Sequence, residues 1–156
     1  MNMKIDGSSS PISNNPSFSP VFVNPQAILD VLNQIQAAMD TYSDLPAKPT
    51  SEQGLFAALE MKIIPSLCTK AIDLAYGTMY NPDNPPLNPV VNQFCQDMTS
   101  LSAAATDALP SLWSIVGSKE TSTPISNDAA NEFQKDWDAM EAALGDATNQ
   151  LNNVAN

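Results

Sequence analysis

Apolar residues recur at alternating intervals of four and three near the end of the chain, and this spacing constrains the fold more than any other feature. On an α-helix such a rhythm produces one narrow apolar stripe, which must be buried against other helices. A narrow stripe suits packing at a shallow crossing angle, as in helical bundles. The stripe consists of Phe133, Trp137, Met140, Leu144, Ala147, Leu151 and Val154.

A second stretch with helical spacing begins after Asn24-Pro25. Asparagine is a favoured N-cap residue, and proline is well tolerated at the first helical position. Leu45-Pro46 predicts the end of this helix, because the residue before a proline avoids the α conformation. Its apolar stripe is Ile28, Val31, Leu32, Ile35, Met39 and Tyr42.

The next helix is predicted to begin at Thr50, since Thr50 and Gln53 have the spacing of a capping box. Pro65 interrupts the pattern and predicts a kink or a break near Ile64. The pattern fades at Gly77. We expect four large residues in its first half to continue the buried stripe, namely Leu55, Phe56, Leu59 and Ile63.

A third helix is predicted to follow Asn88-Pro89, to bend or end at Pro110, and to continue as a short apolar turn that stops at Gly117. The last helix is expected to begin near Ser126. Short connections favour antiparallel neighbours. The sequence therefore predicts an all-α, up-and-down bundle of four main helices, the second and third kinked or split at prolines.

Two regions of the chain differ in composition. Residues 1–23 are rich in serine, asparagine and proline, which predicts a disordered or extended N-terminal tail. The cluster at 21–23 is apolar and is expected to dock on the domain or to act as a staple before the first helix. Residues 24–156 are predicted to form a single helical-bundle domain, a length that buries a sizeable core.

The chain contains no histidine and no arginine, which removes most general-base chemistry and most nitrogen ligation of metals. Its formal net charge of −11 disfavours nucleic acid as a partner. No apolar run is long enough to span a membrane. Asp136, Asp138 and Glu141 crowd one helix and are expected to form a solvated face. We therefore predict a protein that is not an enzyme and that uses no metal or cofactor.

Cys68 and Cys95 leave two alternatives open. Either both are small buried residues, or they form a disulfide between neighbouring helices. They cannot form a metal pair, because no further ligands have suitable spacing.

Because the sequence shows no catalytic constellation, the functional hypotheses rest on its apolar residues. The leading one is binding of a protein partner, or self-association, through an aromatic anchor or the last helical stripe. The alternative is a carrier that holds an apolar small molecule or lipid between its helices, because methionine-rich interiors deform easily. The methionines concerned are Met39, Met61, Met79, Met98 and Met140. The candidate interface residues are Leu112, Trp113, Ile115, Val116, Phe133, Trp137, Met140 and Leu144.

Residues 1–20 read MNMKIDGSSSPISNNPSFSP and resemble the export signals of bacterial type III secreted proteins. The likeness implies a secreted effector or translocation-apparatus component, active in virulence, whose partner is a secretion chaperone or a host protein. Because no apolar segment of a cleavable signal follows Lys4, export is expected by a route other than the general secretory pathway. A cytoplasmic location is the alternative.

Overall fold

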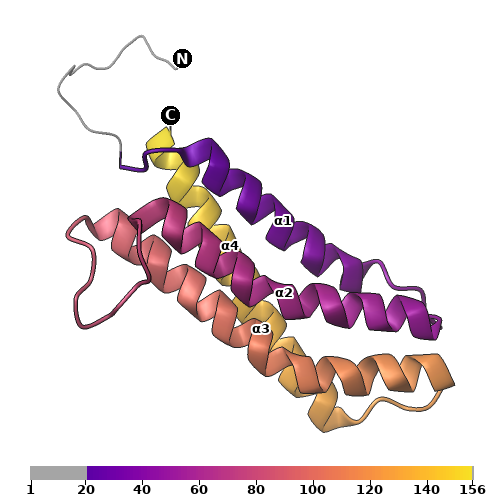
Figure 1. Ribbon diagram of the computed structural model, residues 1–156. Coiled ribbons are helices and arrows are strands. Elements are labelled where there is room, and N and C mark those ends of the chain that lie inside the picture. The colour runs from indigo at the N-terminus through magenta and orange to yellow at the C-terminus, as the bar shows by residue number, and fades with distance from the viewer. Residues whose placement is uncertain (1–20, 156) are drawn as a thin grey trace.

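The computed structural model describes residues 21–155, and this part of the chain contains four α-helices and no strand. The helices are α1 (Pro25–Ser43), α2 (Ser51–Tyr76), α3 (Pro89–Thr121) and α4 (Asn127–Ala155). Consecutive helices run in opposite directions (Figure 1). α2 packs against α1 and α3, and α3 packs against α4, whereas the contact between α1 and α4 is the smallest of the four helix contacts. The predicted all-α, up-and-down bundle is confirmed.

The helices begin where their capping residues predict. The side chain of Asn24 accepts a hydrogen bond from the backbone N–H of Ala27, at 3.2 Å. Thr50 and Gln53 form both bonds of the capping box, at 3.1 and 2.8 Å. Asn88 and Ser126 cap α3 and α4 in the same way. Each cap satisfies backbone donors that the first turn leaves without a partner.

Neither internal proline splits its helix. α2 continues through Pro65, and α3 continues through Pro110 and past Gly117 to Thr121. Figure 1 shows both helices bending partway along, so the expected kink is present and the expected break is not. The stop predicted at Gly117 is wrong. An internal proline costs about 3 kcal/mol, and the burial of apolar side chains on both sides of it offsets that cost.

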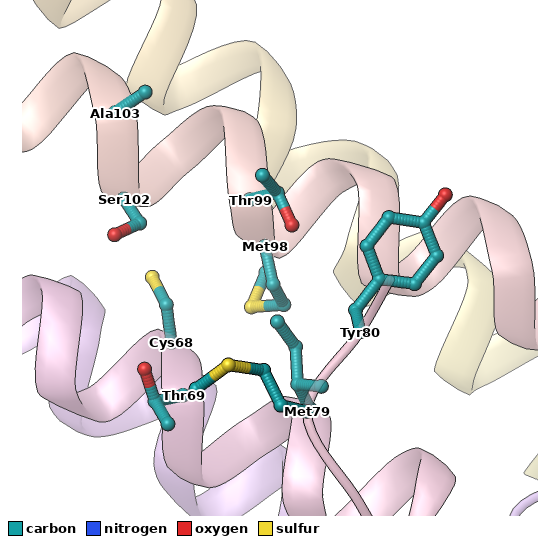
Figure 2. Close-up of a pocket in the computed structure, with 9 residues that line it drawn as sticks. Cys68, Thr69, Met79, Tyr80, Met98, Thr99, Ser102 and Ala103 are labelled. Atoms are coloured by element: carbon teal, nitrogen blue, oxygen red, sulfur yellow. The ribbon is translucent and has the colours of Figure 1, made fainter. Parts of the chain in front are cut away.

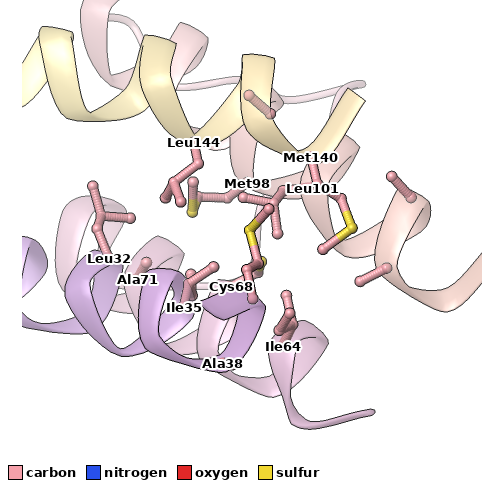
Figure 3. Packing of buried hydrophobic residues seen from close by; sticks show 14 of the residues in the cluster. Leu32, Ile35, Ala38, Ile64, Cys68, Ala71, Met98, Leu101, Met140 and Leu144 are labelled. Atoms are coloured by element: carbon pink, nitrogen blue, oxygen red, sulfur yellow. The ribbon is translucent and has the colours of Figure 1, made fainter. Parts of the chain in front are cut away.

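All four helices contribute to one apolar core, part of which Figure 3 shows between α4 and the pair formed by α1 and α2. Phe22, which precedes α1, is also buried and meets the ring of Phe94 edge-on at 5.4 Å. The segment at 21–23 therefore docks on the bundle through one aromatic side chain. The rest of the predicted tail, residues 1–20, lies outside the described residues.

The inner face of α2 differs from the prediction. Its buried residues are Gly54, Ala57, Ala58, Met61, Ile64, Cys68, Ala71 and Ile72. The four larger residues expected there, Leu55, Phe56, Leu59 and Ile63, are instead 43–55% exposed. The first turns of α2 thus bury their smallest side chains and expose their largest.

The physical reason is the close approach of α2 to α3. A Cβ atom added at Gly54 would collide with Val116 and with the carboxylate of Glu120. Only a residue without a side chain fits there, and Ala57 and Ala58 continue the small surface along the helix. Larger side chains on this face would push α2 away from the core.

We predict that Gly54→Ala destabilises the protein by about 1–3 kcal/mol, because the added methyl group overpacks the contact between α2 and α3. Gly145→Ala is the matched control, since no atom lies within 4 Å of a Cβ built at Gly145. That change should stabilise α4 by about 0.5–1 kcal/mol, the difference in helix propensity. Urea unfolding measures both, and equal stability of Gly54→Ala and wild type would contradict the close contact.

Candidate functional site

The outer face of α2 carries the largest group of exposed apolar side chains on any one helix among the described residues. Leu55 is 48% exposed, Phe56 55%, Leu59 47% and Ile63 43%. At 100° per residue, these four positions centre on the side of α2 opposite its buried residues. α2 is therefore apolar on two opposite faces, and only one of them is covered by the bundle. We call the four residues the α2 outer face.

Trp113 of α3 extends this surface. It is 46% exposed, and it lies three residues before Val116, which faces Gly54 of α2. Because α2 and α3 run antiparallel, Trp113 lies at a height between those of Phe56 and Leu59 along the helix axis. Trp113 is the one candidate interface residue from the sequence that is exposed.

The other candidate interface residues lie inside the bundle. Trp137 is partly buried, and its ring stacks on Phe133 and contacts Tyr42, with centroids 5.6 and 5.5 Å apart. The packing of the monomer thus already covers this stripe of α4. Six of the residues are buried: Leu112, Ile115, Val116, Phe133, Met140 and Leu144.

Cys68 and Cys95 are free, buried thiols, so the disulfide that the sequence left open is not formed. Burial raises the pKa of Cys68 to about 12 and that of Cys95 to about 11. The thiolate, which is the nucleophile and metal ligand of cysteine, is thereby disfavoured at neutral pH.

A pocket of about 350 Å³ lies between α2, α3 and the connector that joins them (Figure 2). Cys68 and Thr69 line it from α2, Met98 and Ser102 from α3, and Tyr80 from the connector. Met79, expected on an inward face, is 75% exposed at its edge. The lining is mainly apolar and includes cysteine and methionine sulfur atoms but no carboxylate. The pocket is therefore suited to holding an apolar group and provides no carboxylate for acid–base chemistry.

A polar cluster interrupts the apolar contact between α3 and α4. Asp97 is buried and accepts hydrogen bonds from Gln93 at 3.1 Å and from Gln150 at 3.2 Å. Burial, together with a hydrogen bond and charge repulsion from Asp146, raises the pKa of Asp97 to about 7, and the hydrogen bonds from Gln93 and Gln150 act in the opposite direction. Asp97 therefore keeps its proton up to near neutral pH, well above the range of an ordinary aspartate. The sequence pattern contained no signal for this cluster.

Asp136 is a second buried carboxyl group, and the expectation that it lies on a solvated face is wrong. Its Oδ2 atom has no hydrogen-bond partner. Burial raises its pKa, and the nearby charges of Asp107 and Glu132 act in the same direction. Raised carboxyl pKa values occur in catalytic sites, but neither Asp97 nor Asp136 lines the pocket between α2 and α3.

Comparisons with protein-family models, with curated proteins and with solved structures found no match for this chain. Within residues 21–155, no group of three or more histidine, cysteine or acidic side chains is placed to hold a metal ion. None of the described helices has the length and apolarity to cross a membrane. The class that the structure defines is an all-α four-helix bundle with one uncovered apolar helix face.

We predict that Asp97 makes stability depend on pH. Because the folded chain holds this proton more tightly than the unfolded chain, the free energy of unfolding decreases as the pH rises from about 4 to about 7. Asp97→Asn should flatten that slope and stabilise the protein at pH 8 by roughly 1–3 kcal/mol. Chemical denaturation at several pH values measures the effect.

Asp138→Asn is the control for this experiment, because Asp138 is an exposed carboxylate of α4 that accepts its hydrogen bond from Gln134. It should leave the slope unchanged. An unchanged slope in Asp97→Asn would show that Asp97 is ionised in the folded chain.

Proposed function

We propose that this chain works by binding another protein through the α2 outer face, and that it is not an enzyme. The observation that carries the proposal is the inversion of α2, which buries glycine and alanine and exposes leucine, phenylalanine and isoleucine. Full burial of one such side chain is worth about 1.5–3 kcal/mol, so leaving four of them half-exposed forgoes a large stabilisation. A binding partner that covers them recovers it.

The neighbouring tryptophan supports the same proposal. Aromatic residues dominate the energetics of protein interfaces, and Trp113 is exposed on α3, the helix whose Val116 packs against Gly54 of α2. The exposed fractions of the residues of the α2 outer face, with that of Trp113, correspond to roughly 500 Å² of apolar surface, since large side chains offer about 200 Å² each. Patches of this size on a monomer often have a function.

The biological setting proposed for this binding is export from a bacterium. It rests on the likeness of residues 1–20 to type III export signals, and those residues lie outside the described part of the chain. On this proposal the partner is a secretion chaperone or a host protein, and the chain acts as an effector or as part of the secretion apparatus.

We predict that Leu59→Asp abolishes partner binding while the bundle stays folded. Leu59 is about half exposed, so the change should lower the free energy of unfolding by no more than about 1–2 kcal/mol. Retention of partners from native or host extracts, together with thermal unfolding, measures the two effects. The matched control is Leu87→Asp, which adds the same charge on a fully exposed connector residue. Equal retention by both variants would contradict the proposal.

A second candidate function is favoured by the pocket between α2 and α3. Its volume of about 350 Å³ is at the lower end of known ligand sites, and its lining is mainly apolar. A carrier of a small apolar molecule is expected to retain it through mild purification. Native mass spectrometry should then detect an added mass that Ala103→Trp, which fills the pocket, removes. A chain with no retained or displaceable ligand is not a carrier.

A further inference from the structure

We infer that the segment that covers the α2 outer face is an amphipathic helix of another protein, with lysine or arginine beside its apolar stripe. This inference rests on the proposed function and adds the chemistry of the partner. Three features of the described residues support it: the shape of the face, the charges along its edges, and the small area available for a second copy of the chain.

The shape of the face favours a helix as the occupant. Leu55, Leu59 and Ile63 are spaced by four residues and, with Phe56, form a ridge about 12 Å long. The backbone of α2 is hydrogen-bonded within the helix, so it offers no edge to which a strand could add. A partner must satisfy its own backbone and contribute only side chains. A helix does both, because its side chains form grooves that accept such a ridge.

The charged side chains around the face are mainly acidic. Glu52 lies at its N-terminal end, in line with Phe56 and Leu59. Glu60 lies on one edge, and Lys62 lies on the other, nearer to α3. The chain as a whole has a formal net charge of −11. A basic partner is therefore attracted over a long range and then pairs with the two glutamates, whereas an acidic partner is repelled.

A second copy of the chain fits this face less well. The exposed apolar surface of roughly 500 Å² is below the roughly 800 Å² that each partner buries in a standard interface. Two copies also bring two charges of −11 together. The negative charge that repels a second copy of the chain attracts a helix with basic residues.

Two labelled model peptides test the inference against the full chain. Both have three heptads with leucine at the a and d positions, and they differ only in lysine or glutamate at the flanking positions. We expect fluorescence anisotropy to show that the lysine peptide binds at least about tenfold more tightly than the glutamate peptide. Leu59→Asp should abolish this binding, and Leu87→Asp should leave it unchanged.

Charge variants locate the basic contact. The double change Glu52→Lys and Glu60→Lys should remove most of the preference for the lysine peptide, and Lys62→Glu should keep or increase it. Equal binding of both peptides with loss in Leu59→Asp overturns the inferred charge and leaves the proposed surface in place. Lysine-peptide binding that persists in Leu59→Asp overturns the inference, because it reflects general attraction to an acidic protein.

Sedimentation analysis of the chain alone tests whether a second copy of the chain covers the α2 outer face. A monomer at micromolar concentration is the expected result. A dimer that Leu59→Asp dissociates would identify a second copy as the occupant and would overturn the inference of a basic helix, while the proposed binding surface would stand.

Discussion

The close approach of α2 to α3 is the contact on which the rest of the structure depends. It is possible because Gly54 has no side chain to separate the helix from Val116 and Glu120. Ala57 and Ala58 extend the same small surface, and the larger Met61 and Ile64 are buried in the turns that follow. Since the inner face of the first turns is used by small residues, the large residues of those turns must point outward.

The core and the proposed binding face are therefore two sides of one helix. A substitution on the inner side changes the free energy of unfolding, whereas a substitution on the outer side changes the surface that is available to a partner. The polar cluster around Asp97 is separate from both, because it lies sixteen residues before Trp113, or about 24 Å along α3. Its proton links stability to pH at one end of the bundle while the proposed binding face occupies the other.

Local chemistry explains why much of the fold could be predicted. Asn24-Pro25, Asn88-Pro89 and the Thr50–Gln53 pair are short-range signals, and each one marks a helix start that the structure contains. The prolines were harder to interpret, because their effect depends on burial of residues elsewhere. Pro110 bends α3 and does not end it, since Leu112, Ile115 and Val116 are held in the core by contacts distant in sequence.

The sequence by itself determined the number of helices, their direction and the absence of histidine and arginine, because these follow from residue spacing, capping and composition. Only the tertiary structure decided which side of α2 is the core, where Asp97 and Asp136 are buried, and that the two thiols stay apart. α2 is apolar on both sides, and periodicity assigns such a helix no inner face. Packing against the neighbouring helices selects the buried side, and α3 packs on the side where Gly54 has no side chain to prevent close contact.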